Sequence, residues 1–103
     1  MSLFSDILKT LPTIDHIDSL ELVDKDEGVV IIENRPGKAG SVAVYNALLQ
    51  EFGRLNSEAA HRGLELYAEH TEDARTNPGK HPNIDRLFEL IKNGGELQIK
   101  IVV

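Results

Sequence analysis

Hydrophobic residues near the start of the chain recur at three- and four-residue spacings, the period of an amphipathic helix. Proline at position 12 follows these residues and cannot continue a helix. We therefore predict a short helix over residues 2–11, packed through one face. The apolar positions of this face are Leu3, Phe4, Ile7, Leu8 and Leu11.

The next segment has the features of a β-hairpin. Leu20 and Leu22 are two positions apart and so share one face of a strand near residues 18–24. The turn residues "KDEG" follow, and β-branched residues then predict a second strand near residues 29–33. The run from Val29 to Ile32 is apolar on both faces, which indicates a central strand covered on two sides or a strand paired with a partner.

Two helical patterns follow the hairpin. Ser41 stands where an N-cap is expected, and an apolar stripe then continues to Gly53, which suits the left-handed position after a helix. A second pattern begins at Asn56 or Ser57 and predicts one long helix to about Arg75.

A third helix is predicted from its cap at Asn83 to Gly94, and the alternation in residues 96–103 predicts a last strand. The chain is therefore expected to form a single domain, 1–103. Its predicted fold class is α+β and two-layer: a small three-stranded sheet, made of the N-terminal hairpin plus the C-terminal strand, with about four helices packed on it.

Composition narrows the range of functions. The 103 residues are 41% hydrophobic and have a formal net charge of −6, which opposes binding to nucleic acid because phosphate backbones attract clustered Lys and Arg. No apolar run approaches the roughly 20 residues of a membrane-spanning helix, and no signal-peptide pattern is expected. The absence of cysteine excludes disulfides and thiolate chemistry, so a cytoplasmic location is the expectation.

The tripeptide Pro-Gly-Lys occurs twice, each time shortly before a predicted helix start. Each Pro-Gly pair suits a type II turn, and a lysine beside a positively polarised helix start could hold an anion. The two turns could share a ligand if the last strand runs parallel to the second strand, and they lie at opposite ends of the sheet if it does not. The alternative is that both turns are plain chain reversals and bind nothing. The candidate anion-binding residues are Arg35, Lys38, Ser41, Lys80 and His81.

The predicted long helix carries an acidic stripe formed by Glu58, His61, Glu65, Glu69 and Glu72. Its like charges repel, so a cation would relieve them. That cation could be a divalent metal, since "EAAH" has the Glu-x-x-His spacing of metal-binding bundles. It could also be Lys80 pairing with Glu72 or Asp73, or arginines of the same helix, on an otherwise solvated face. The candidate metal or acid/base residues are His61, Glu65, Glu69, His70 and Asp73.

Two stretches of the chain, "GLELYAEHTEDARTNPGKHPNIDRL" at 63–87 and "ENRPGKAGSVAVYNAL" at 33–48, support a family resemblance. The chain resembles a small bacterial family that is known only as a domain of unknown function. The resemblance spans most of the chain, least so the first 30 residues. It implies a free-standing bacterial protein of about this size, and it implies no activity, cofactor or catalytic residue.

Together these observations favour a non-enzymatic binding or protein-interaction domain, whose partner is a second copy of itself or another protein. No cofactor is expected, and neither nucleic acid nor a membrane is expected as a partner. The alternative is a small domain that binds an anionic ligand or a metal, with catalysis at the 34–41 and 70–81 loops. This alternative requires the two loops to line a common cavity.

Overall fold

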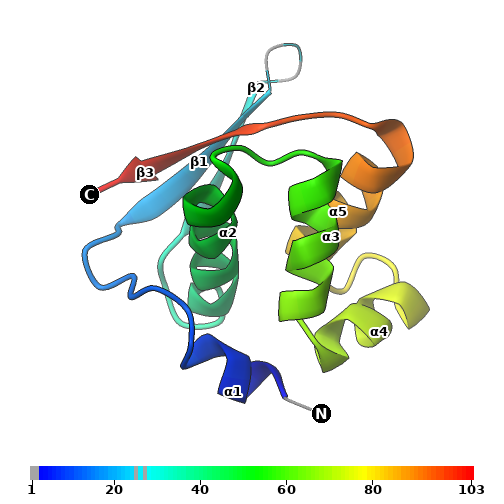
Figure 1. Ribbon diagram of the computed structural model, residues 1–103, viewed down its shortest axis with the longest axis horizontal. Coiled ribbons are helices and arrows are strands. Elements are labelled where there is room, and N and C mark those ends of the chain that lie inside the picture. Colours follow the sequence, from blue (N-terminus) through cyan, green and yellow to red (C-terminus); the bar gives the residue numbers. More distant parts are fainter. Residues whose placement is uncertain (1–2, 25, 27) are drawn as a thin grey trace.

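A computed structural model describes residues 3–24, 26 and 28–103. The described chain forms an antiparallel sheet with helices on one side, which confirms the predicted two-layer α+β fold (Figure 1). The elements in chain order are α1 (Phe4–Leu8), β1 (Ser19–Asp24), β2 (Gly28–Glu33), α2 (Ala39–Phe52), α3 (Ser57–Leu66), α4 (Glu69–Thr76), α5 (Pro82–Asn93) and β3 (Gln98–Val102).

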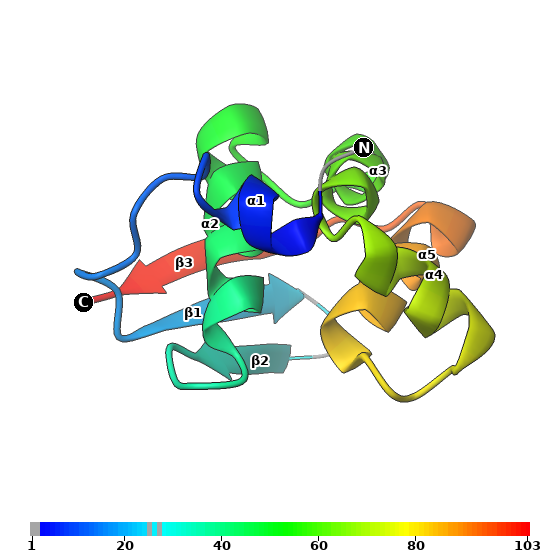
Figure 2. The ribbon, with the colours of Figure 1, turned by 90° about the horizontal axis from the view of Figure 1, so that it is seen from below.

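The sheet has the strand order β2-β1-β3, and β1 pairs antiparallel with both neighbours. Leu20 lies opposite Ile32 of β2, and Leu22 lies opposite Ile99 of β3, so these side chains share one face. Because β2 and β3 both run opposite to β1, they run in the same direction, as the shared-ligand hypothesis required (Figure 2).

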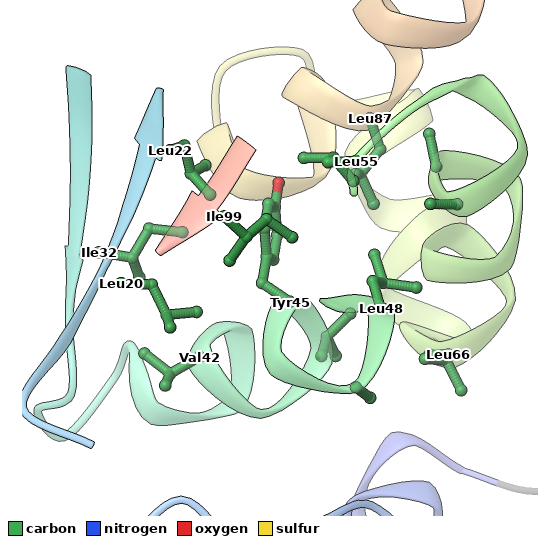
Figure 3. Packing of buried hydrophobic residues seen from close by; sticks show 14 of the residues in the cluster. Leu20, Leu22, Ile32, Val42, Tyr45, Leu48, Leu55, Leu66, Leu87 and Ile99 are labelled. Carbon is green, nitrogen blue, oxygen red and sulfur yellow. The ribbon is translucent and has the colours of Figure 1, made fainter. Parts of the chain in front are cut away.

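The hydrophobic core lies between this face of the sheet and the helices. Seven consecutive residues of α2, from Val42 to Leu48, are buried, because the helix has the sheet on one side and α3 on the other. Figure 3 shows Tyr45 and Leu48 between side chains of the sheet and those of the other helices. The helix ends at Gly53, whose φ of 75° confirms the predicted left-handed position.

The two longest helices of the described chain run in the same direction across the molecule. Both α2 and α5 end near an isolated bridge in which Leu55 and Leu97 exchange main-chain hydrogen bonds of 3.0 and 2.8 Å. Both helices begin on the β2 side of the sheet (Figure 2). Their first turns can therefore face a common space.

The prediction of one long helix over residues 57–75 is wrong in one respect: the segment forms two helices, α3 and α4. Ala68 has a φ of 52°, which is incompatible with a continuous α-helix, and α4 departs in a new direction. Thr71 Oγ1 donates a 2.5 Å hydrogen bond to the Leu64 carbonyl and so helps to satisfy the end of α3. The predicted acidic stripe is interrupted at this break.

Other predicted details also differ. The strand β2 lies at the edge of the sheet and is not a central strand: Val29, Val30 and Ile31 are 54%, 45% and 58% exposed. Lys38 and His81 occupy the N-cap positions of α2 and α5, so the predicted caps Ser41 and Asn83 lie inside the first turns. The first helix is shorter than predicted and has no fully buried residue.

The remaining boundaries agree with the sequence patterns. The hairpin strands, the helix start at Asn56 or Ser57 and the helix end at Gly94 are confirmed. In the described part of the chain, no helix is both long and apolar enough to cross a membrane.

Candidate functional site

A cavity of about 530 Å³ lies between the free edge of β2, the edge that faces away from β1, and the first turns of α2 and α5. Phe4 of α1 and the joint between α3 and α4 close it on another side. A cavity of this size is in the range that holds small-molecule ligands. Its charged and imidazole side chains are Lys38, Lys80, Arg86, His70 and His81, and none of the described residues that line it is Asp or Glu.

Both Pro-Gly-Lys turns contribute to this cavity. In each turn, the lysine N–H closes the reversal: Lys38 donates to the Arg35 carbonyl at 2.9 Å, and Lys80 donates to the Asn77 carbonyl at 3.1 Å. Gly37 and Gly79 have φ values of 87° and 91°, as the third position of a type II turn requires. The sequence therefore predicted the turn geometry correctly, and the fold brings the two lysines to one concavity.

The starts of α2 and α5 present uncapped main-chain donors to the cavity. In the described residues, no side chain caps either start, whereas Asn56 Oδ1 caps α3 by accepting from the Ala59 N–H at 2.9 Å. The first N–H groups of a helix have no partner inside the helix. Gly40, Ser41 and Asn83 occupy such first-turn positions and line the cavity.

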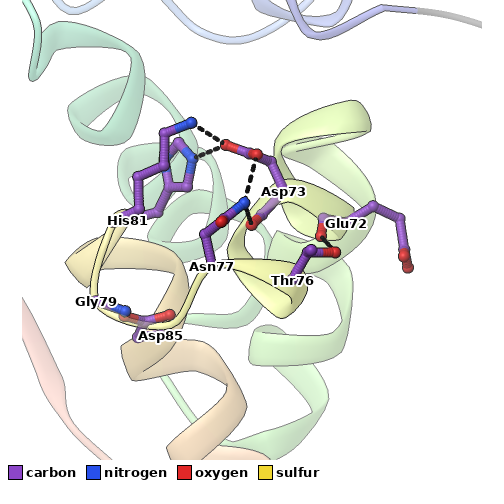
Figure 4. Close-up of polar contacts among 8 residues, drawn as sticks. Glu72, Asp73, Thr76, Asn77, Gly79, His81 and Asp85 are labelled. Carbon is purple, nitrogen blue, oxygen red and sulfur yellow. Dashed lines mark hydrogen bonds and ion pairs between the residues drawn. The ribbon is translucent and has the colours of Figure 1, made fainter.

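Two carboxylates outside the cavity hold the second Pro-Gly-Lys turn in place (Figure 4). Asp73 Oδ2 contacts Lys80 Nζ at 2.9 Å and His81 Nε2 at 2.6 Å, which confirms the predicted pairing of Lys80 with Asp73. Asp85 Oδ2 accepts from the Gly79 N–H at 2.9 Å. Hydrogen bonds from His81 and then from Lys80 lower the pKa of Asp73 to about 2.

Lys38 differs from Lys80 in its surroundings. Within the residues that the structure describes, Lys38 has no carboxylate within ion-pair distance. The cavity therefore holds one lysine whose charge is partly balanced by Asp73 and one whose charge has no such counterpart. An anion that enters between them would be attracted by both.

Hydrogen bonds join the cavity-lining residues Asn83 and Arg86 to buried Tyr45, which does not itself line the cavity. Tyr45 donates to the Asn83 carbonyl at 2.5 Å, and Arg86 Nη1 donates to Tyr45 Oη at 3.1 Å and to Asn83 Oδ1 at 2.8 Å. Tyr67 donates to Ser41 Oγ at 2.7 Å. Burial raises the pKa of Tyr45 to about 12 and also raises the pKa of Tyr67, so both phenols remain protonated donors at neutral pH.

An aromatic group closes the cavity toward the N-terminal segment. Phe4 stacks on Tyr67 with ring centroids 5.5 Å apart, and its ring is nearly perpendicular to that of His70, with ring centroids 5.1 Å apart. The Phe4 N–H donates to Glu69 Oε1 at 2.7 Å, and this hydrogen bond lowers the pKa of Glu69. The first helix is therefore fixed to α4 at a wall of the cavity.

Four of the five predicted anion-binding residues line the cavity: Lys38, Ser41, Lys80 and His81. The fifth, Arg35, is not among the lining residues and pairs with Glu33 at 2.8 Å. Sequence reasoning missed Arg86, whose only signal was its place one turn after the predicted cap Asn83. It also missed Phe4, which the helical pattern had assigned only to packing.

The predicted metal or acid/base residues are dispersed by the break between α3 and α4. His61 and Glu65 lie on α3, while Glu69, His70 and Asp73 lie on α4. Of these, only His70 lines the cavity. No group of three His, Asp or Glu side chains within residues 3–24, 26 and 28–103 has an arrangement that could hold a metal ion.

Comparison with known proteins places the chain in a family. Residues 4–101 match the family described as "Uncharacterized protein conserved in bacteria (DUF2322)", and the chain belongs to this family. The sequence resemblance to a bacterial family of unknown function is thereby confirmed. No curated protein and no solved structure matches the chain.

Proposed function

We propose that this member of an uncharacterised bacterial family is a non-enzymatic binding protein whose cavity holds the anionic group of a ligand, a phosphate or a carboxylate. One observation carries the proposal. The chain has 17 acidic and 11 basic residues, yet its cavity is lined by Lys38, Lys80 and Arg86 and by no described acidic residue. Such a local reversal of charge favours an anion over a cation or a neutral group.

Main-chain geometry supports the same ligand chemistry. The starts of α2 and α5 face the cavity without a side-chain cap, so the N–H groups of Gly40, Ser41 and Asn83 are suitable donors to anionic oxygens. Each helix also contributes the positive end of its dipole. Lysine side chains and helix starts then act on the same ligand group.

The hydroxyl groups in the cavity are arranged for binding. A serine nucleophile requires an adjacent base, but the hydrogen bond to Ser41 Oγ comes from Tyr67, a donor whose pKa is raised by burial. His81 Nε2 is engaged by Asp73, in a contact that holds the turn carrying Lys80. We therefore favour binding over catalysis for this cavity.

Thermal unfolding in different salts tests the proposal. Phosphate or sulfate should raise the melting temperature beyond a chloride control of equal ionic strength, because a ligand that binds only the folded state adds about 2.7 kcal/mol at a hundredfold excess over Kd. The double variant Lys38→Ala, Lys80→Ala should lose this gain.

A matched control separates the site from general charge effects. The double variant Lys92→Ala, Lys100→Ala removes the same charge from exposed positions that do not line the cavity, and it should keep the full gain. If phosphate stabilises both double variants and the wild type equally, the cavity does not bind the anion and the proposal is wrong.

A further inference from the structure

The free edge of β2 lies beside the proposed anion site, and the inference drawn from it rests on that proposed function. The Asn34 N–H donates to the Asp18 carbonyl at 2.9 Å, in register with the β1–β2 ladder. Hydrogen-bonded pairs alternate along an antiparallel ladder, so Val30 and Ile32 direct their main-chain groups toward β1. The N–H and C=O of Ile31 then point away from β1, toward the outer side of the edge strand.

This edge borders the cavity. Val30, Ile31 and Ile32 all line it, although successive side chains of a strand point to opposite faces. Three consecutive residues can do so only where the cavity meets the strand along its edge. The unpaired main-chain groups of Ile31 are therefore next to the space that contains Lys38 and Lys80. In the described part of the chain, no strand pairs with this side of β2.

We propose that an extended peptide segment adds to the sheet as a new strand beside β2, with acidic side chains at alternate positions. Main-chain hydrogen bonds to Ile31 would supply affinity, as in other cases of strand addition. Alternate side chains of the added strand face the helical layer, where carboxylates meet Lys38 and Lys80. The intervening side chains face the outer side of the sheet, beside exposed Val29 and Ile31, and are apolar.

Charge complementarity selects this partner over a second copy of the chain. In a symmetric antiparallel pair of β2 strands, the residues facing the helical layer are Val30 and Ile32 of each copy. These side chains bring no carboxylate to the cavity. A peptide with alternating acidic and apolar residues supplies hydrogen-bond partners for the free edge and negative charges for the lysines. Pairing with a second copy supplies only the hydrogen bonds.

Two synthetic peptides test the charge requirement. We expect acetyl-Val-Glu-Val-Glu-Val-amide to bind the full chain at least about tenfold more tightly than acetyl-Val-Gln-Val-Gln-Val-amide, because hydrogen bonds to charged groups are stronger than those between neutral groups. Isothermal titration calorimetry measures both affinities. The advantage of the acidic peptide should disappear in the variant Lys38→Ala, Lys80→Ala and persist in Lys92→Ala, Lys100→Ala.

N-methylation of the acidic peptide tests strand pairing without changing its charge. In an added strand, alternate amides point toward β2, so methylating either the Val amides or the Glu amides should abolish binding, and methylating the other set should not. The variant Ile31→Pro, which removes the edge N–H, should lose peptide binding but keep the stabilisation by phosphate. Proline is tolerated where the N–H of an edge strand faces outward.

The outcomes separate this inference from the proposed function. If phosphate stabilises the protein through the two lysines while neither N-methylated peptide loses affinity, strand addition is wrong and the anion site stands. If neither phosphate nor the acidic peptide binds, both proposals are wrong. If sedimentation shows a dimer that Ile31→Pro converts to a monomer, the edge is occupied by a second copy and the peptide proposal is overturned.

Discussion

Tyr67 donates a 2.7 Å hydrogen bond from its hydroxyl to Oγ of Ser41, which joins the end of α3 to the first turn of α2. Tyr67 is only 3% exposed, so its hydroxyl has little access to water. The contact fixes one of the two helix starts that face the cavity. It also gives the hydroxyl of a buried tyrosine a polar partner at the candidate site.

Removal of the acceptor and removal of the donor of this hydrogen bond should differ in their effect on the free energy of unfolding. Ser41→Ala leaves a buried donor unsatisfied and should lower the free energy of unfolding by about 1–3 kcal/mol, whereas Tyr67→Phe removes the donor itself and should cost only about 0.5–1.5 kcal/mol. Urea denaturation measures both values. The double variant should be less destabilised than the sum of the single variants; strict additivity would show that the two hydroxyls do not interact.

Gly63 should not tolerate alanine, although alanine favours helices. A Cβ at this position in α3 would lie 2.8 Å from Leu87 Cδ1 and 3.1 Å from Leu48 Cδ1. Overpacking costs roughly 1–3 kcal/mol and the gain in helix propensity is about 1 kcal/mol, so we expect Gly63→Ala to lower the free energy of unfolding by up to about 2 kcal/mol. Glu58→Ala, at an exposed position of the same helix, is the control and should change stability by less than about 0.5 kcal/mol.

Replacement of Ala68 by glycine should stabilise the protein. The Ala68 φ of 52° lies in a region that residues with a Cβ avoid, at a strain of order 1–3 kcal/mol that exceeds the entropic cost of glycine. We therefore expect Ala68→Gly to raise the free energy of unfolding by up to about 1 kcal/mol. Ala74→Gly, inside α4, should have the opposite sign. A destabilised Ala68→Gly variant would contradict the observed break between α3 and α4.

Asp73 should make stability depend on pH in acid. Its pKa is lowered from 3.8 to about 2 by His81 and Lys80, so the folded state favours the ionised carboxylate. This contribution is fully present above pH 4 and is lost as the pH falls toward 2. The melting temperature of Asp73→Asn should lie below that of the wild type at pH 6, and the difference should shrink between pH 4 and pH 2. A difference that is constant over this range would contradict the contact.

Local sequence signals predicted much of the fold because they depend on neighbouring residues. The hairpin period, the helix ends at Gly53 and Gly94, and both Pro-Gly-Lys turns follow from such signals. The break at Ala68 could not be predicted, because the chain there has neither proline nor glycine, and the contacts of Phe4 with Tyr67 and Glu69 on either side of it are distant in sequence. The position of β2 in the sheet was left open, since an apolar run has the same pattern in a covered central strand and in a strand that pairs with a partner, and the fold excludes the central position.

The candidate site was predicted only in part, because local signals identify single residues and not the contacts between distant ones. Lys38 and Lys80 were found from their turns, but their approach depends on the parallel courses of α2 and α5, which only the fold shows. The sequence pattern around Arg86 is that of a solvated helix residue, and the pattern around Phe4 is that of a core residue. Their roles depend on contacts across 41 and 65 positions of sequence, to Tyr45 and Glu69, which no local signal encodes.

An NMR titration with inorganic pyrophosphate tests most directly whether one cavity holds the anion between the two turns. The amide resonances of Gly40 and Ser41 at the start of α2 and of Asn83 at the start of α5 should shift together and fit a single dissociation constant. These shifts should vanish in Lys38→Ala, Lys80→Ala. Shifts confined to one helix start, or two different dissociation constants, would contradict a shared anion site.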